Sequence, residues 1–217
     1  MVKKILFFGD SITDANRLRE DQMEWNKAHR LGTGYVNYIA AQTLYKTPGA
    51  DIAFINKGIA GNRIKDLFCR LHEDVIAEKP DIISIMIGIN EVWCKQNAGG
   101  EVEPHRFHFT YKAVLDEIKE KLGNIPIVLI EPFCLPNERL TGGFDTWKEL
   151  LTPLQTETKK LSEEYKCHFI PMQTKFDELL NLADAEYWLW DGIHPLQAGH
   201  MAIAKAWLDA AGNLLML

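Results

Sequence analysis

The sequence predicts an α/β protein in which a parallel sheet is covered by helices on both faces. Short apolar runs rich in β-branched residues, each bounded by Gly, Pro, Asn or Asp, alternate with segments whose apolar residues recur at spacings of three or four. The chain has 217 residues, 47% of them apolar, so it can bury a sizeable core, yet it is near the usual ceiling for one α/β unit. We therefore expect a single domain over residues 1–217.

The predicted strands are five short apolar runs, at residues 5–8, 52–56, 82–87, 127–130 and 167–170. The predicted helices are the segments with a helical apolar period, at residues 35–45, 64–76, 109–122, 147–165 and 196–208. Strands separated by helices imply right-handed crossovers and parallel pairing. In an open sheet of this kind, ligands bind outside the carboxyl ends of the strands.

Four short polar segments carry the groups that an esterase needs. They are residues 9–11, 58–61 and 88–91, which close the first three predicted strands, and residues 191–195. Ser11 in the first segment is a candidate nucleophile, although a Gly-Asp-Ser turn after a strand more often only caps the next helix. Asp10 is the structural member of this triplet, with a carboxylate that ties down backbone amides of the loop.

The last segment supplies a candidate base and its partner. Asp191 precedes His194 by three positions, so its carboxylate can reach Nδ1 of the imidazole and leave Nε2 for Ser11. Alone, a histidine before Pro195 is typical of a surface loop, but the other three segments favour a catalytic role. We interpret His200 as a residue of the last helix that packs near this loop.

Glycine and asparagine donors complete the set. Gly58 and Gly61 are both typical turn residues, but a backbone N–H that must approach an oxyanion closely favours glycine. Asn90 is either a cap at the end of a strand or a neutral side-chain donor for developing negative charge. Together the four segments favour a serine hydrolase.

The same residues carry a family resemblance over nearly the whole chain. The segments 8–13 (FGDSIT), 56–62 (NKGIAGN), 87–91 (IGINE) and 191–195 (DGIHP) resemble the four blocks of the SGNH hydrolases, also called the GDSL esterases and lipases. Within the family, residues 32–36, 84–90 and 198–201 are most similar to intracellular acetylxylan esterases. Thr13 and Glu91 depart from the leucine and aspartate common at their positions, and neither touches an atom that the mechanism requires.

The resemblance implies a three-layer α/β/α, flavodoxin-like SGNH hydrolase fold with a central parallel five-stranded sheet. It places the functional roles on Ser11, Gly61, Asn90, His194 and Asp191. It also implies a substrate, an O-acetyl ester on xylose units of short oligosaccharides. The runner-up is a lysophospholipase- or thioesterase-type acyl hydrolase, and a reading from another class is a noncatalytic sugar-binding module on the same fold. Candidates for substrate contact are Asp10, Arg63, Trp93 and Trp190, since aromatic faces suit sugar rings, although core packing explains the tryptophans equally well.

Composition and spacing disfavour several other functions. The net charge of -6 disfavours binding to nucleic acid or anionic lipid, and no apolar run approaches the roughly 20 residues of a membrane span. The Cys69/His72 and His105/His108 pairs lack a second pair at ligand spacing, so we expect no metal and no other cofactor. Gly32-Thr33-Gly34 lacks the third glycine of a dinucleotide fingerprint.

The remaining expectations concern location and assembly. The apolar run after Lys3 and Lys4 is too short for a signal peptide, and the four cysteines show no CxxC spacing, so we expect reduced thiols and a cytoplasmic protein. Two segments, 14–32 and 93–104, are expected to be long loops beside the pocket. Tryptophans near such loops, with the resemblance, lead us to expect a homo-oligomer.

Overall fold

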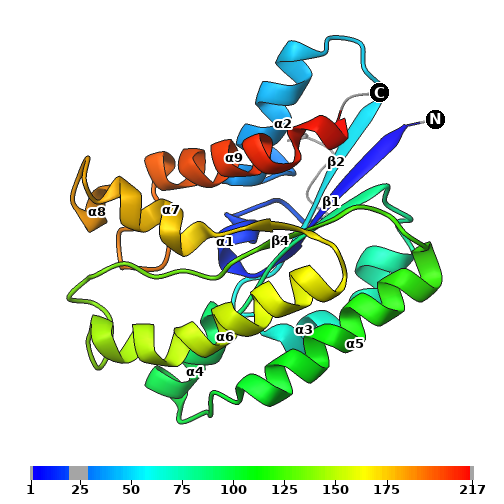
Figure 1. The fold of residues 1–217 in the computed structure, drawn as a ribbon. Helices are drawn as coiled ribbons and strands as arrows, with labels where there is room; N and C mark the ends of the chain where they lie inside the picture. The colour runs from blue at the N-terminus through cyan, green and yellow to red at the C-terminus, as the bar shows by residue number, and fades with distance from the viewer. Residues whose placement is uncertain (1, 20–28, 216–217) are drawn as a thin grey trace.

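The computed structural model describes residues 2–19 and 29–215, and at its centre is one parallel sheet with the strand order β2-β1-β3-β4-β5 (Figure 1). The strands are β1 (Lys3–Gly9), β2 (Ile52–Gly58), β3 (Ile82–Met86), β4 (Ile127–Ile130) and β5 (His168–Ile170). Every adjacent pair is parallel. The predicted fold class is confirmed, and each of the five predicted strands is present.

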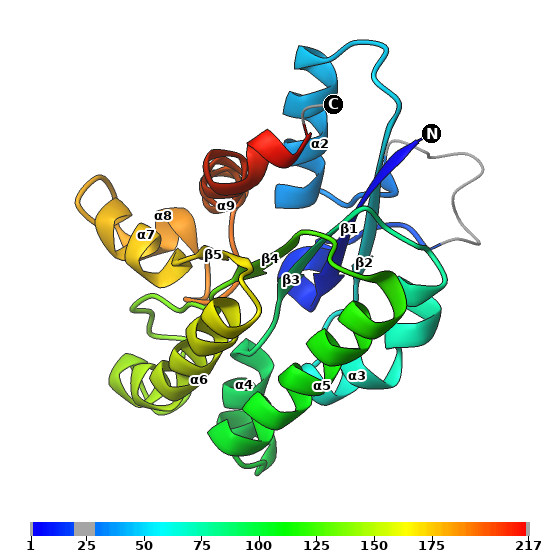
Figure 2. The same ribbon diagram turned by 45° about the vertical axis from the view of Figure 1, so that its right-hand side comes forward.

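Helices cover both faces of the sheet (Figure 2). On one face lie α2 (Tyr35–Lys46) and α9 (Gln197–Ala211), which pack against each other. The other face carries α3 (Ile64–Cys69), α5 (Pro104–Leu122) and α6 (Phe144–Glu164). Because both faces are covered, residues 5–8 of β1 have no exposed surface, which is why the strands read as continuous apolar runs in the sequence.

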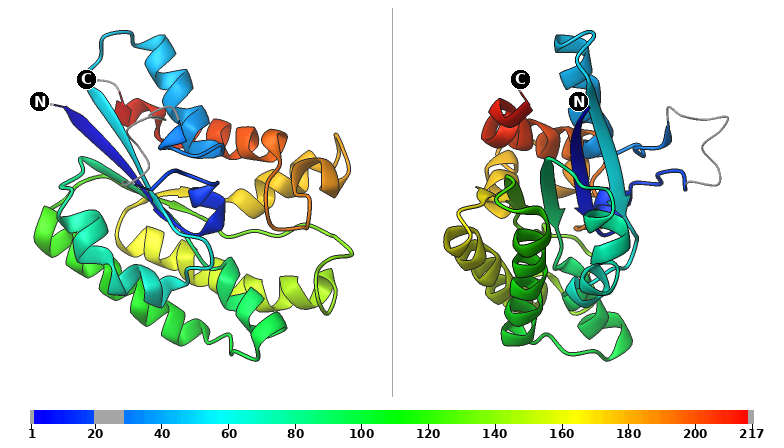
Figure 3. Two further views of the ribbon diagram at one scale, coloured as in Figure 1. Left: turned by 180° about the vertical axis from the view of Figure 1, so that it is seen from behind. Right: turned by 90° about the vertical axis from the view of Figure 1, so that its right-hand side faces the viewer.

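The strand order places a topological switch point beside β1. This strand pairs with β2 on one side and β3 on the other, so the connections leave toward opposite edges and open a crevice at the carboxyl ends. The four-residue helix α1 (Ser11–Asp14) follows β1 directly, and Figure 3 shows it between the two helix layers. The first polar segment of the sequence therefore lies where such sheets bind ligands.

Several expected elements differ from those observed. The helix predicted over 64–76 is divided, because α3 ends at Cys69 and a π-helical turn, η3, covers His72–Ile76. The loop predicted over 93–104 is wrong in its first half, where α4 spans Ile89–Ala98. Of the other predicted loop, 14–32, residues 20–28 lie outside the described part of the chain.

Besides α1 and α4, three further short helices of the described chain were not predicted. They are α7 (Met172–Leu179), α8 (Ala185–Trp188) and the 3-10 helix η4 (Gly212–Leu215). α7 and α8 lie beside α9, and α8 leads into the segment that holds His194. Within the described ranges, no helix is both long and apolar enough to cross a membrane.

Candidate active site

Ser11 is held at the start of α1 by a tight exit from β1. The Asp10 carboxylate caps α1, since its Oδ1 accepts the Ile12 backbone N–H at 3.0 Å. A Cβ on Gly9 would lie 2.4 Å from Thr13 Oγ1 and 2.5 Å from the Met86 carbonyl oxygen. Only glycine therefore fits where the chain turns from the strand into the helix.

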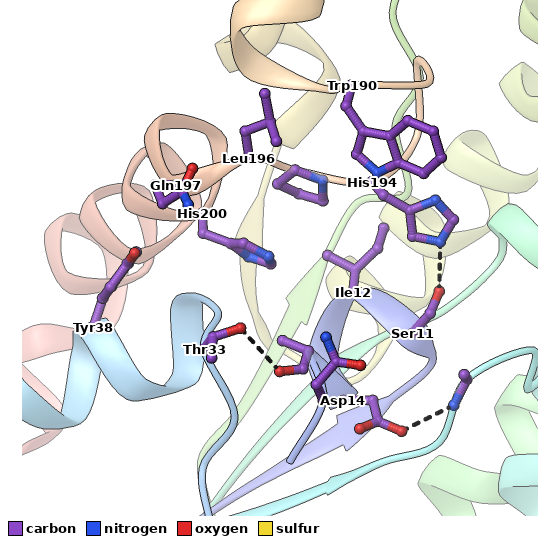
Figure 4. Close-up of a pocket in the computed structure, with 14 residues that line it drawn as sticks. Ser11, Ile12, Asp14, Thr33, Tyr38, Trp190, His194, Leu196, Gln197 and His200 are labelled. Carbon is purple, nitrogen blue, oxygen red and sulfur yellow. Dashed lines mark hydrogen bonds between the residues drawn. The ribbon is translucent and has the colours of Figure 1, made fainter. Parts of the chain in front are cut away.

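A chain of two hydrogen bonds joins the serine, the histidine and the aspartate. Ser11 Oγ lies 3.0 Å from His194 Nε2 (Figure 4), and His194 Nδ1 lies 2.7 Å from Asp191 Oδ2. The other oxygen of Asp191 accepts the backbone N–H groups of Ile193 at 2.9 Å and His194 at 2.7 Å. Those two bonds fix the carboxylate, which in turn fixes the orientation of the imidazole. The geometry is that of a nucleophile, a base and an orienting acid.

The charges of the pair favour an ionised Asp191. Burial acts to raise the pKa of Asp191, but the hydrogen bonds from His194 and Ile193 outweigh it, and the pKa falls below its ordinary value of 3.8. Burial acts to lower the pKa of His194, but the Asp191 carboxylate outweighs it, and the pKa rises above 6.5. The ring is thus a stronger proton acceptor than a free imidazole.

Trp190 supports the imidazole from one side. Its ring stacks on that of His194 at a centroid distance of 6.2 Å, and its backbone N–H donates to the His194 carbonyl oxygen at 3.1 Å. The Arg139 guanidinium lies over the indole at 5.8 Å and donates to the Trp190 carbonyl oxygen at 3.0 Å. Trp190 therefore helps to hold the base in place while 47% of its surface remains exposed.

The loop that carries Gly61 is anchored by buried polar side chains. Asp14 Oδ2 accepts the Ala60 N–H at 3.3 Å, and Asn56 Oδ1 accepts the Gly58 N–H at 2.9 Å. Gly61 has a φ of +81°, and a Cβ there would meet no atom of the described chain within 4 Å. Its backbone N–H, like that of Ser11, donates to none of the residues that the structure describes. Both amides are free to bind an anion.

Asn90 and Glu91 connect α4 to this loop. Asn90 Nδ2 donates to the Asn62 carbonyl oxygen at 3.0 Å, which leaves its second N–H for another acceptor. The Glu91 Oε1 accepts the Ile64 N–H at 2.8 Å, at the start of α3. The two residues tie the third polar segment to Asn62 and Ile64, just after Gly61, so the Asn90 side chain keeps a fixed position relative to the Gly61 loop.

A pocket of about 540 Å³ opens at Ser11 and His194. Of the predicted substrate contacts, Trp190 lines this pocket. Asp10 is buried beneath α1, and the Arg63 guanidinium points to Cys94 Sγ, which accepts a hydrogen bond from it at 3.2 Å. Trp93 is exposed on α4, outside the pocket wall. The pocket wall also contains Thr33 and His200, which sequence reasoning did not assign to it.

The glycines on either side of Thr33 were noted in the sequence as part of the family resemblance, but they were not assigned to the pocket. Gly32 has a φ of +78°, and a Cβ on Gly34 would lie 2.8 Å from Cε1 of His200. The two glycines thus allow the segment before α2 to pack closely against α1 and α9. Among the residues that the structure describes, no group of three or more His, Cys, Asp or Glu side chains is arranged to hold a metal ion.

Comparison with known proteins agrees with this geometry. The model of the GDSL-like lipase/acylhydrolase family matches residues 7–202, and the chain belongs to that family. It is therefore a carboxylic ester hydrolase. The chain is 37% identical over 213 residues to an acetylxylan esterase of Geobacillus stearothermophilus, an alignment that covers 97% of this chain and 94% of that protein.

Solved structures give the same relationship. A protein described as a GDSL-like lipase from Parabacteroides merdae superposes with a TM-score of 0.89 at 35% identity, covering 100% of this chain and 99% of that one. The acetylxylan esterase of Geobacillus stearothermophilus superposes with a TM-score of 0.84 at 34% identity, covering 97% of this chain and 94% of that one. Structures of that esterase include catalytic mutants in which a serine, an aspartate or a histidine is replaced by alanine.

Proposed function

We propose that the chain is a serine esterase that removes acetyl groups from xylo-oligosaccharides or related sugars. The observation that carries the proposal is the continuous path from Ser11 Oγ through His194 to Asp191, open to a pocket at the carboxyl end of the sheet. The acetyl and xylose parts of the proposal rest on the similarity to an acetylxylan esterase.

The proposed reaction is a two-step acyl transfer. His194 removes the proton from Ser11 as Oγ attacks the ester carbonyl carbon, and Asp191 stabilises the imidazolium that forms. The amides of Ser11 and Gly61 and the side chain of Asn90 hold the oxyanion. His194 then gives its proton to the departing alcohol oxygen, and water cleaves the acetyl-enzyme by the same relay. No step in this sequence requires a metal or an organic cofactor.

The test is the release of acetate from acetylated xylo-oligosaccharides. Wild type should release acetate, and Ser11→Ala should lose nearly all turnover while its melting temperature is retained. A serine-directed organophosphorus reagent should label Ser11. Labelling of another residue, or undiminished turnover by the alanine variant, would show that Ser11 is not the nucleophile.

The same test separates the alternatives. A lysophospholipase or thioesterase would release little acetate from sugars and would act on long-chain acyl substrates instead. A noncatalytic sugar-binding module would bind xylo-oligosaccharides without turnover. The four free cysteines of the described chain support our proposal that the enzyme works in the reducing cytoplasm.

We also propose that residues 1–217 act as one domain and assemble into a homo-oligomer. Trp93 and Trp190 are each 47% exposed, and burial of such aromatic surface between symmetric copies is favourable. Light scattering across the micromolar range should give a mass that is a multiple of 24.8 kDa. A single species of 24.8 kDa would contradict the proposal of an oligomer.

A further inference from the structure

The pocket at Ser11 extends toward the α2/α9 layer. Its wall is built from α1 and the turn after it, the segment around the start of α2, and the segment that runs from Trp190 into α9, with Ala60 as its one residue from the loop after β2 (Figure 4). Gly61 and Asn90, the groups placed to bind the oxyanion, are not among the residues that line it. The pocket therefore lies to one side of the ester carbonyl that Ser11 would attack.

The chemistry of ester cleavage decides which part of the substrate fills this side. The carbonyl oxygen must face the oxyanion donors, and His194 must come within hydrogen-bond reach of the leaving oxygen in order to protonate it. His194 and Trp190 belong to the pocket wall, so the leaving oxygen and the alcohol attached to it lie on the pocket side. This assignment rests on the proposed function.

The wall opposite Ser11 carries several hydrogen-bonding side chains. Thr33, Tyr38, Gln197 and His200 all line it, and they come from the segment before α2, from α2 itself and from α9. A wall of this kind suits an alcohol that bears further hydroxyl groups, whereas a long acyl chain would require an apolar one. Thr33 Oγ1 donates to the Ala15 carbonyl oxygen at 3.2 Å, whereas the hydrogen bond that His200 accepts leaves the other nitrogen of its ring free to act on a ligand.

His200 is locked as a neutral donor. Its Nδ1 accepts the backbone N–H of Tyr35 at 3.2 Å, so the ring hydrogen must be on Nε2. Burial and the nearby charge of His194 lower the pKa of His200 to about 4, which keeps the ring neutral at physiological pH. Nε2 makes no hydrogen bond to the part of the chain that the structure describes, and the ring extends into the pocket in Figure 4.

The surroundings of His200 are built to keep this orientation. The ring lies nearly parallel to that of Tyr35 at a centroid distance of 6.5 Å, with an interplanar angle of 20°. A Cβ on Gly34 would lie 2.8 Å from Cε1 of His200, so the absence of a side chain there allows the close approach of the two segments. His200 itself is 9% exposed, and a donor held so rigidly loses little entropy when it binds.

We propose that His200 is a specificity-determining residue that donates a hydrogen bond from Nε2 to an oxygen of the sugar that bears the acetyl group. A buried donor of this kind binds a hydroxylated leaving group and is left unpaired by one without hydroxyls. The enzyme should therefore discriminate between acetylated sugars and simple acetate esters at this position, while the chemistry at Ser11 remains the same for both.

Two substitutions of His200 separate the role of Nε2, the proposed donor to the substrate, from that of Nδ1, which accepts the Tyr35 N–H. In His200→Asn, the amide oxygen takes the place of Nδ1 and continues to accept the Tyr35 N–H, but the side chain is too short to supply the Nε2 donor. In His200→Gln, the longer side chain brings an amide N–H close to the position of Nε2. The exposed His72 on η3 offers a matched control, His72→Asn.

The readouts are kcat/KM for acetylated xylo-oligosaccharides and for p-nitrophenyl acetate, whose leaving group has no hydroxyl besides the one released. His200→Asn should lower kcat/KM for the sugar ester about 5- to 10-fold, mainly through KM, and should leave p-nitrophenyl acetate within about twofold of wild type. His200→Gln should recover part of the loss, and His72→Asn should match wild type on both esters.

Two results would overturn the inference. Equal losses on both esters together with a lower melting temperature for His200→Asn would show a structural role, and an unchanged kcat/KM for the sugar ester would show no role. Failure of the proposed function is seen separately, in the wild-type enzyme. Wild type that hydrolyses p-nitrophenyl acetate but releases no acetate from any acetylated sugar would refute the sugar substrate, and with it the role of His200.

Discussion

Replacement of Glu91 by glutamine should make the protein increasingly stable relative to wild type as pH rises. The Glu91 carboxyl is buried, its Oε1 accepts the Ile64 N–H, and its Oε2 is buried without a hydrogen-bond partner among the described residues. Burial raises the pKa of Glu91 from 4.5 to about 7, although the hydrogen bond from Ile64 opposes the rise. An ionised carboxylate at this position is therefore costly.

The magnitude follows from linkage. The unfolded chain releases the Glu91 proton above about pH 4.5, whereas the folded protein holds it until about pH 7. In that window the folded state binds more protons, so the free energy of unfolding falls as pH rises, and above pH 7 the loss is complete. At about 1.4 kcal/mol per pKa unit, the loss is about 3 kcal/mol at pH 8 and about 1 kcal/mol at pH 5.

Glu91→Gln keeps an oxygen for the Ile64 N–H and removes the ionisation. The free energy of unfolding of the variant, measured by urea denaturation, should rise relative to wild type by about 2.5 kcal/mol between pH 5 and pH 8. Asp10 and His200 also titrate differently in the folded state, but both are present in the two proteins, so their own contributions cancel apart from the repulsion between Asp10 and Glu91 that helps to raise the pKa of Glu91. The exposed Glu138 supplies a control, Glu138→Gln, which should follow wild type at both pH values. A difference between Glu91→Gln and wild type that does not change with pH would show that Glu91 is ionised in the folded protein, and the reasoning from burial would fail.

Four further predictions concern activity. The kcat/KM of wild type should fall as pH drops through the raised pKa of His194, above 6.5, because the base must be neutral to accept a proton. Asp191→Asn should shift this fall in kcat/KM to lower pH and reduce kcat by orders of magnitude. A pH-rate profile whose acidic limb does not shift would mean that Asp191 does not set the basicity of His194. Across p-nitrophenyl esters, kcat/KM should decline from C2 through C4 to C8; an apolar acyl channel would instead add about 0.8 kcal/mol per buried methylene, so a preference for C8 would move the assignment to lipid or thioester substrates. Incubation with EDTA should leave turnover unchanged, and a loss that zinc or calcium restores would contradict the proposed metal-free mechanism.

The parts of the structure that could be predicted are those in which a short sequence pattern can arise from only one kind of local structure. Strands buried on both faces must be apolar throughout, and the groups that follow them must be polar to turn the chain at the sheet edge. Ser11 follows from such a signal, because it directly follows β1 at the carboxyl edge of the sheet. His194, 183 positions away, follows no strand, and it was predicted from its spacing to Asp191 and from the family resemblance.

The segment after Asn90 illustrates why other parts could not be predicted. Gly99 and Gly100 indicated a loop, but the chain is helical up to Ala98, and Gly99 is the C-terminal cap in a left-handed conformation, with a φ of +67°. At the other end, Gly88 provides no side-chain hydrogen bond to cap α4, so the usual start signal is missing. The helix depends on the burial of Ile89 and Val92, a tertiary effect.

The direction of a side chain is also difficult to derive from its position in the sequence. Arg63 was a candidate for substrate contact, but its guanidinium turns to Cys94. His200 was interpreted as a packing residue and does pack on Tyr35. It also lines the pocket, which depends on the way that α9 crosses α2 and cannot be derived from a periodic pattern.

Two carboxyl groups act on His194, and their pKa values are shifted in opposite directions. Asp191 accepts three N–H groups, two from the backbone and one from the imidazole, and its pKa lies below 3.8. Asp10 accepts the Ile12 N–H, its second oxygen is buried without a partner in the described chain, and burial raises its pKa to about 7. An ionised Asp10 would raise the pKa of His194 further and keep the ring protonated, which would make it a poorer base near neutral pH. The deeper burial of Asp10 thus lets it cap the helix of the nucleophile with less negative charge, while Asp191, bonded to the imidazole and to two backbone N–H groups, supplies the charge that His194 needs.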